Sequence, residues 1–234
     1  MKVWALSDLH LSYDGNKSMD VFGAGWENYM SRIKENWQAV INSDDVVLVP
    51  GDISWAMRLD EARDDLNFLD QLNGKKIIIK GNHEYWWKSI SAVREMLPES
   101  ITALQNDCVK IGKIIICGTR GWVIPESTKE WSVEDEKIYK REIERLRLTL
   151  NSMQKIREDG DIVLCMMHFP PFDFEHKDSE FTKLLEEYSV DKCVYGHLHN
   201  TRGKCPIRVK KNEIEYIFAS TDALEHKPIL IAES

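Results

Sequence analysis

The chain has 234 residues, 43% of them hydrophobic, which is enough apolar material for one sizeable core. Its formal net charge of −8 argues against a protein that holds nucleic acid by neutralising many phosphates, because that mode of binding requires a basic face. The charge does not exclude a phosphate substrate, since bound divalent cations can reverse the sign of the charge within a local site.

We expect residues 1–234 to form a single domain. No segment approaches the ~20 consecutive apolar residues of a membrane-spanning helix, and no signal peptide is visible. The cysteines show no metal-ligand spacing, and most lie in apolar runs, which is typical of buried thiols in a reducing compartment. These are Cys108, Cys117, Cys165, Cys193 and Cys205. The sequence therefore predicts a cytoplasmic protein without a membrane partner, and it leaves the oligomeric state open.

The first third of the chain alternates β-rich runs with helical patterns. Strands are expected at Lys2–Ser7, Val46–Val49 and Ile77–Lys80, and helices at Tyr29–Ile41 and Asp60–Leu72. Because a strand that is followed by a helix and another strand usually pairs in parallel with that next strand, this order predicts parallel strands with crossover helices. The fold class is therefore α/β.

Two hairpins are expected further along the chain. Residues 108–118 read CVKIGKIIICG and turn at Ile111-Gly112-Lys113, and residues 207–220 turn near Asn212. Hairpins join antiparallel strands, so we expect the sheets to be mixed.

A long charged helix is expected between Val133 and Glu158. Its apolar residues fall on one narrow helical stripe, which consists of Tyr139, Ile143, Leu146, Leu150 and Met153. Such a stripe most often covers a sheet, and a cap or partner-binding surface is the alternative.

Polar side chains with metal-binding chemistry follow five of the expected strands. They are Asp8 and His10, then Asp52, then Asn82 and His83, then His168, and finally His197 and His199. In open α/β sheets, ligands bind at the carboxyl ends of the strands, so these residues are expected to converge. Five of the seven histidines lie at these ends, whereas His176 and His226 lie elsewhere and should be dispensable for turnover.

Gly51, Gly81 and Gly196 each directly precede a candidate ligand, where a residue without Cβ lets the chain turn sharply and approach the site.

The residue types indicate which ions the site would take. Carboxylate, amide and imidazole donors without a thiolate suit Mn, Fe, Zn, Ni or Co better than a soft metal or calcium. So many donors are too many for one ion, and two divalent or transition-metal ions sharing a carboxylate could clamp a phosphoryl group.

Five short motifs occur in a fixed order: Asp-x-His at 8–10, Gly-Asp at 51–52, Gly-Asn-His-Glu at 81–84, a lone His168, and Gly-His-x-His at 196–199. This ordered set resembles the motif blocks of the calcineurin-like metallophosphoesterase superfamily. The resemblance implies a four-layer αββα sandwich, in which two mixed β-sheets are flanked by helices, and a dinuclear metal centre.

The resemblance also implies a role for each residue. Asp8, His10 and His199 would bind one metal, Asn82, His168 and His197 the other, and Asp52 would bridge them. A metal-bridging hydroxide would attack phosphorus, and His83 would act near the leaving group as general acid or transition-state donor. Asp8, Asp52 and Glu84 are the candidates for orienting His83.

The sequence departs from one branch of that superfamily. Serine/threonine protein phosphatases follow their Gly-Asp with Asp-Arg and place Arg before Gly-Asn-His-Glu, whereas here Ile53 follows Asp52 and Lys80 precedes Gly81. We therefore expect a hydrolase that acts on a small phosphomonoester or phosphodiester. The alternatives are a metal-dependent nuclease, which would need a basic groove, and a non-catalytic metal-binding scaffold.

The sequence does not decide which residues contact the substrate. Four tryptophans lie in or just after the expected site loops, where they could form an aromatic wall or pack in the core: Trp55, Trp86, Trp87 and Trp122. Arg120 could hold a phosphate or form a surface ion pair. Residues 126–135 are expected to form a rim beside the site.

Overall fold

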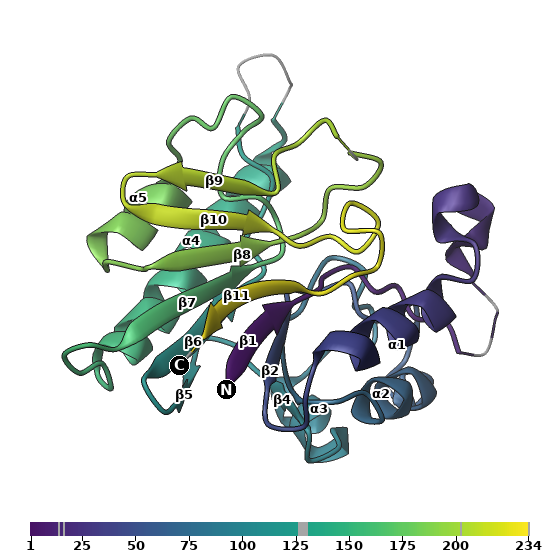
Figure 1. Ribbon diagram of the computed structural model, residues 1–234. Helices are drawn as coiled ribbons and strands as arrows, with labels where there is room; N and C mark the ends of the chain where they lie inside the picture. Colours follow the sequence, from purple (N-terminus) through teal and green to yellow (C-terminus); the bar gives the residue numbers. More distant parts are fainter. Residues whose placement is uncertain (14, 16, 126–130, 202, 234) are drawn as a thin grey trace.

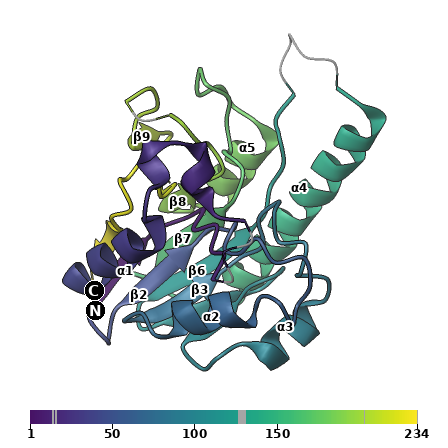
Figure 2. The same cartoon turned by 90° about the vertical axis from the view of Figure 1, so that its right-hand side faces the viewer.

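Two β-sheets pack face to face, and helices cover both outer faces (Figures 1 and 2). The computed structural model describes residues 1–13, 15, 17–125, 131–201 and 203–233. No helix in these ranges is long and apolar enough to cross a membrane.

The first sheet has five strands in the order β11-β1-β2-β3-β4. Its strands are β1 (Lys2–Ala5), β2 (Val46–Val49), β3 (Lys75–Ile78), β4 (Ile101–Ala103) and β11 (Ile229–Glu233). All neighbours are parallel except β11, which runs antiparallel to β1. The helices α1 (Tyr29–Val40), α2 (Arg63–Asp70) and α3 (Ile90–Met96) pack on its outer face, and the short 3₁₀ helices η1 (Met19–Phe22) and η2 (Ala24–Trp26) precede α1.

The second sheet has six strands in the order β5-β6-β7-β8-β10-β9. Its strands are β5 (Cys108–Ile111), β6 (Ile114–Thr119), β7 (Ile162–Met167), β8 (Lys192–Tyr195), β9 (Arg208–Lys211) and β10 (Ile214–Phe218). The four central strands are parallel, and the two edge strands are antiparallel members of the expected hairpins. The outer face is covered by α4 (Val133–Gln154) and α5 (Glu180–Glu187).

Buried apolar residues form three layers, one between the two sheets and one under each group of helices. Val3 and Ile116 belong to the central layer, Trp37 to the layer under α1–α3, and Leu146 to the layer under α4 and α5. Each strand residue therefore packs on one face or the other, as the two-residue side-chain period of a strand requires. The expected αββα sandwich of two mixed sheets is confirmed.

The expected stripe of the long helix packs on the six-stranded sheet. Leu146, Leu150 and Met153 are fully buried there, and Tyr139 and Ile143 are partly buried against the same core. The helix ends at Gln154 and not at Glu158. The backbone N–H of Glu158 donates instead to the Asp161 side chain (2.8 Å), which closes a turn into β7.

Strand β3 begins two residues earlier than the sequence predicts, at Lys75. Two lysines in succession read as the end of a polar loop, yet Lys76 is completely buried. Its ammonium group donates to the carbonyl oxygens of Asp70 (3.2 Å) and Leu72 (2.8 Å) at the end of α2. The lysine thus satisfies helix-terminal carbonyls that would otherwise be buried without partners.

Candidate metal centre

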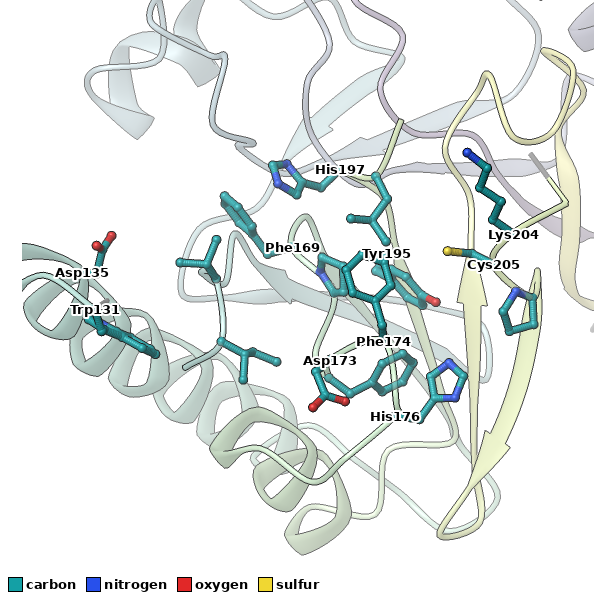
Figure 3. Close-up of a pocket in the computed structure, with 16 residues that line it drawn as sticks. Trp131, Asp135, Phe169, Asp173, Phe174, His176, Tyr195, His197, Lys204 and Cys205 are labelled. Carbon is teal, nitrogen blue, oxygen red and sulfur yellow. The ribbon is translucent and has the colours of Figure 1, made fainter. Parts of the chain in front are cut away.

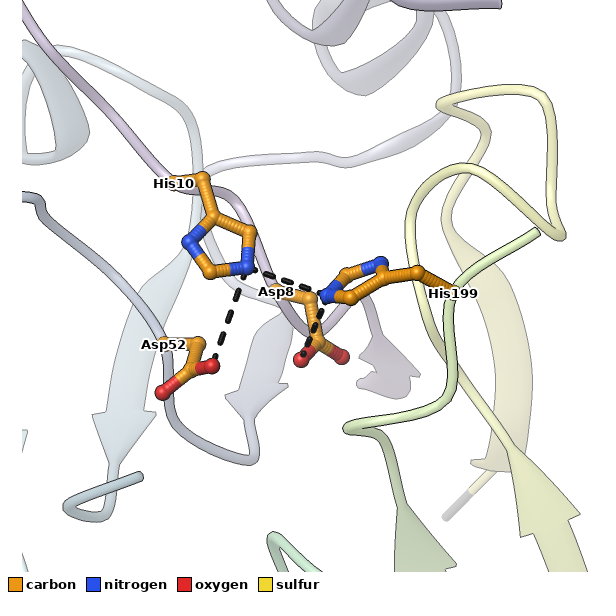
Figure 4. A group of neighbouring side chains, drawn as sticks. All are labelled: Asp8, His10, Asp52 and His199. Atoms are coloured by element: carbon orange, nitrogen blue, oxygen red, sulfur yellow. Dashed lines mark hydrogen bonds and ion pairs between the residues drawn. The ribbon is translucent and has the colours of Figure 1, made fainter. Parts of the chain in front are cut away.

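The loops that follow β1, β2, β3, β7 and β8 converge at one edge of the two sheets and bring the expected metal-binding residues together. Asp8, His10, Asp52 and His199 form a first cluster (Figure 4), and Asp52, His168 and His197 form a second. Within each cluster one ligand atom of every residue lies within 4.8 Å of the others. Asp52 belongs to both clusters, so the two candidate metal positions share a carboxylate.

Distances in the first cluster link residues from three separate loops. His10 Nε2 lies 3.1 Å from His199 Nε2 and 3.7 Å from Asp52 Oδ2. His199 Nε2 in turn lies 3.7 Å from Asp8 Oδ1. Two imidazole nitrogens and two carboxylate oxygens therefore face one small space, as the ligands of a cation do.

The second cluster is built around His168. Its Nε2 atom lies 3.5 Å from Asp52 Oδ2 and 2.6 Å from Asn82 Oδ1, which brings the expected amide ligand to the same place. The rings of His168 and His197 have their centroids 5.0 Å apart. His168 Nδ1 lies 3.0 Å from the Pro50 carbonyl oxygen, so this nitrogen carries the proton and Nε2 keeps its lone pair for a metal.

The electrostatics of the site suit cations. Burial raises the pKa of Asp8, and burial together with the nearby charge of Asp8 raises the pKa of Asp52. Burial also lowers the pKa of His10, and it lowers the pKa of His168 and of His197 to about 3, which keeps these imidazoles neutral. Among the described residues the buried Asp52 Oδ2 has no hydrogen-bond partner. Two close carboxylates and neutral imidazoles are the donor set that divalent transition metals take.

The backbone of the site is strained where the ligands are presented. Asp8, His10, Asp52 and His197 all have positive φ, between 45° and 71°. A Cβ atom on Gly196 would lie 2.2 Å from Asp8 Oδ2, and one on Gly81 would lie 2.3 Å from Asp52 Oδ1. Glycine at these two positions is therefore required by the close approach of a ligand carboxylate.

The sequence of this chain matches the model of a known protein family. The model of the calcineurin-like phosphoesterases matches residues 1–201, which is most of the chain. The chain belongs to this family. The family consists mostly of phosphoester hydrolases. No curated protein matches the chain.

Three solved structures share the fold of this calcineurin-like phosphoesterase. A phosphopantetheinyl hydrolase from Mycobacterium tuberculosis is 16% identical with a TM-score of 0.61, and the match covers 100% of this chain and 96% of that one. A protein of unknown function from Aquifex aeolicus is 18% identical with a TM-score of 0.52, covering 98% and 95% of the two chains. A Thermus thermophilus protein is 9% identical with a TM-score of 0.58, covering 97% and 96%.

The calcineurin-like phosphoesterase site includes two residues that the sequence did not indicate. Asp222 Oδ1 lies 3.2 Å from His199 Nδ1, and Ser220 Oγ donates to Asp8 Oδ2 (2.9 Å). Burial opposes a charged ring at His199, but the hydrogen bond to Asp222 and the charge of Asp8 outweigh it and raise the pKa of His199. Both residues follow β10, which runs parallel to β8 and so ends at the same edge. That position depends on the pairing of β10 with β8, which the sequence pattern of a hairpin does not indicate.

Glu84, a candidate for orienting the His83 ring, is hydrogen-bonded to backbone groups. Its carboxylate accepts hydrogen bonds from the backbone N–H groups of Asp52 (3.0 Å), Ile53 (2.5 Å) and Gly81 (2.5 Å). It thereby ties the loop after β3 to the loop after β2 and positions the backbone of both. These bonds engage backbone groups and not the ring of His83.

His83 lies beside the clusters. Its backbone N–H donates to Asp52 Oδ1 (2.9 Å), and its ring centroid is 5.5 Å from that of His10 and 4.5 Å from that of Trp55. The buried Nδ1 atom of His83 has no hydrogen-bond partner among the described residues. Among the described residues no carboxylate is therefore hydrogen-bonded to this nitrogen.

The four tryptophans divide between core and site. Trp86 and Trp87 are buried in the core under α1–α3, as the core-packing interpretation predicts. Trp55 stacks on His10 with centroids 4.7 Å apart, so it forms a wall of the first cluster. Trp122 lies under the guanidinium group of Arg120, 4.7 Å from the ring centroid.

The remaining candidates lie beside the centre. Arg120 forms an ion pair with the buried Glu142 of α4 (3.1 Å), which favours the ion-pair interpretation, although Glu142 is buried and not a surface residue. His226 belongs to neither cluster and is buried against Trp26, and His176 packs against Phe172. The expected rim continues into α4 at Val133, and its residues 126–130 lie outside the described residues.

Proposed function

We propose that this chain is a metal-dependent phosphoesterase that hydrolyses a small phosphomonoester or phosphodiester. The observation that carries the proposal is the position of Asp52, which is shared by two buried clusters and has an oxygen without a hydrogen-bond partner among the described residues. A carboxylate in this position can hold two cations at the short separation that phosphoryl transfer uses.

Each cluster offers enough protein ligands to hold an ion. Asp8, His10 and His199 would hold one ion, and His168, His197 and Asn82 the other, with Asp52 contacting both. When bound, such ions supply Lewis-acid stabilisation of phosphoryl oxygens and a water of lowered pKa. The chain itself supplies the orientation: the Pro50 carbonyl and Asp222 hold the Nδ1 sides of His168 and His199, so that both Nε2 atoms face the clusters.

His83 is the residue we assign to the leaving group. It is half-buried between His10 and Trp55, and its Nδ1 atom is free of partners among the described residues. A ring so placed can carry a proton to an oxygen atom at the edge of the clusters. The tie between its backbone and Asp52 keeps it at a fixed place relative to the shared carboxylate.

A small substrate is favoured by two observations. The chain lacks the Asp-Arg pair after Gly-Asp and the Arg before Gly-Asn-His-Glu that protein phosphatases carry, and its net charge of −8 disfavours a nucleic acid. One protein of the same fold is named a phosphopantetheinyl hydrolase, a name that refers to a phosphate-bearing group and not to a nucleic acid.

The test is a metal analysis combined with a substrate panel. We expect the purified protein to retain close to two ions per chain and to hydrolyse chromogenic phosphomonoesters or phosphodiesters with Mn, Fe, Zn, Ni or Co. Asp52→Asn keeps the shape of the side chain but removes the shared charge, so it should lower both metal content and turnover by at least tenfold. Asp44→Asn, at an exposed aspartate, is the matched control and should change neither. A single retained ion, or an Asp52→Asn protein with full metal and turnover, would contradict the two-metal site.

A further inference from the structure

The two clusters have different surroundings. The ring of His10 in the first cluster is covered by Trp55, stacked at 4.7 Å, and by the edge of Trp26 at 6.3 Å. Trp26 is itself buried, so aromatic side chains cover this ring on two sides. In the second cluster, His197 forms part of the wall of a cavity of about 510 Å³ (Figure 3). A substrate larger than phosphate can therefore extend from the centre on the side of the second cluster.

The wall of this cavity is mostly apolar. It is built by residues that follow β6, β7 and β8, by the start of α4, and by the segment before β9. Its apolar side chains include Val123, Ile124, Trp131, Phe169, Phe172 and Phe174. A volume of this size lies within the range of pockets that bind small molecules, about 300–1,000 Å³.

The apolar wall is continuous with the metal centre. The ring centroid of Phe169 lies 4.1 Å from that of His197, so a group that leaves the second cluster meets an aromatic face at once. In Figure 3, His197 and Phe169 lie at one end of the cavity, and Phe174 and His176 lie at the other. Phe174 is 69% exposed, which leaves a large apolar surface open to a bound group.

The charged residues that line the cavity limit the chemical class of the ligand further. Lys204 is the one lysine or arginine among the described lining residues, and Asp135 and Asp173 also line the cavity. The Asp135 carboxylate accepts hydrogen bonds from Trp122 and Ser132, and that of Asp173 accepts from backbone N–H groups of its own loop. A second phosphate or another strongly anionic group would meet more negative than positive charge there. The cavity therefore suits a neutral group.

We propose that this cavity binds the organic substituent of the phosphoester, and that this substituent is aromatic or otherwise largely apolar and neutral. The inference rests on the proposed function, because it takes the phosphoryl group to lie at the two clusters. It excludes sugar phosphates and nucleoside polyphosphates as good substrates, since both would place polar or charged groups against the phenyl rings.

The test compares two phosphonates, which resemble phosphoesters but cannot be hydrolysed at the bridging atom. Methylphosphonate and 1-naphthylmethylphosphonate are titrated calorimetrically into the Mn²⁺-loaded protein. Burial of a naphthyl group removes enough apolar surface from water that it should bind at least about tenfold more tightly. Phe174→Ala and Val123→Asp should each reduce this preference by about threefold or more, while leaving the affinity for methylphosphonate unchanged.

Matched controls come from η1, which does not line the cavity. Phe22→Ala and Val21→Asp make the same changes at exposed residues and should keep the full preference. Equal affinity for the two phosphonates, or a preference that survives Phe174→Ala and Val123→Asp, would overturn the assignment. If the naphthyl preference is found and depends on Phe174 but no ester is hydrolysed with any metal, the proposed hydrolysis fails and the cavity assignment stands.

Discussion

The imidazole of His83 lies next to His10 of the first cluster but belongs to neither of the two candidate ligand groups found among the described residues. If it donates a proton to the leaving oxygen, its loss should matter most for a poor leaving group, because general acid catalysis contributes ~10²–10⁴-fold where charge would build up on an alkoxide. His83→Ala should therefore lower kcat far more for an alkyl phosphoester than for its p-nitrophenyl analogue, with metal content unchanged. Single-turnover kinetics would ensure that chemistry is measured for both esters. Equal losses would assign His83 to the phosphoryl oxygens, and lost metal would make it a ligand.

Protonation of the ligands should compete with the metals. In the metal-free protein the pKa values of Asp8, Asp52 and His199 are raised, so at about pH 6 these groups hold protons that a metal must displace. His168 and His197, with lowered pKa values, release none. Metal affinity should accordingly rise as the pH rises through the range of the raised pKa values and then level off. Calorimetry in buffers of different ionisation enthalpy should detect more released protons at about pH 6 than at about pH 9, and equal release would contradict this.

Much of the candidate site could be predicted at the scale of single residues, because metal-binding side chains after parallel strands are expected at one edge whatever the details of packing. Ser220 and Asp222 could not be found in this way. Their strand, β10, reads as the second half of a hairpin, and only its pairing with β8 turns its end toward the site. The roles assigned to the ligands and to His83 stay predictions.

At the scale of elements, His226 joins η2 to the turn after β10. Its Nε2 lies 2.9 Å from the carbonyl oxygen of Gly25, and its Nδ1 lies 3.0 Å from Thr221 Oγ1. His226→Ala would remove both partners. Thr221 is buried, and a buried group that loses its partner costs ~1–3 kcal/mol, whereas Gly25 is exposed and its carbonyl oxygen can bond to water. We expect chemical denaturation to show a destabilisation of about 1–3 kcal/mol, with kcat of the folded variant changed less than a few-fold.

His176→Ala is the matched control for stability, because His176 is half-exposed, and its free energy of unfolding should stay close to that of the parent protein. A folded His226→Ala protein without activity would show that the segment around Gly25 takes part in the chemistry. A stable His226→Ala protein would show that water replaces the imidazole in its two hydrogen bonds.

Element boundaries could be predicted where hydrophobic periodicity is strong. The prediction was wrong where a charged residue is buried. The range predicted for β2, Val46–Val49, is confirmed. The range predicted for β3 begins two residues too late, because Lys75 and Lys76 look like loop residues. The short elements β4, α3, α5 and β11 were not predicted. Strands such as β4, with three residues, have too little pattern to stand out, and their existence depends on neighbours that are distant in the sequence.

At the scale of the whole molecule, bound metals should hold the two sheets together and stabilise the folded state. The first cluster takes Asp8 and Asp52 from loops of the five-stranded sheet and His199 from a loop of the six-stranded sheet. A ligand that binds only the folded state stabilises it by about 2.7 kcal/mol at 100 times its dissociation constant, which corresponds to roughly 5–10 °C for a protein of this size.

Removal of the metals with a chelator should therefore lower Tm by that amount, and addition of Mn²⁺ or Zn²⁺ should restore it. Differential scanning calorimetry gives the measurement. Asp52→Asn should respond to neither treatment, whereas Asp44→Asn should respond as the parent protein does. A Tm that is insensitive to chelation in a protein shown to lose its metal would mean that the ions do not hold the sheets together.

The pairing of β1 with β11 joins the two ends of the described chain, with Lys2 opposite Glu233 (Figure 1). A ribosome makes β1 long before it makes β11, which covers the free edge of β1, and before the Ser220 and Asp222 side chains that support Asp8 and His199. A nascent chain therefore carries an uncovered strand edge while the residues between these strands are synthesised, and uncovered edges invite pairing with other chains. The candidate metal centre can be completed only after this region has been translated, so a chain truncated before β11 should bind metal poorly and aggregate readily.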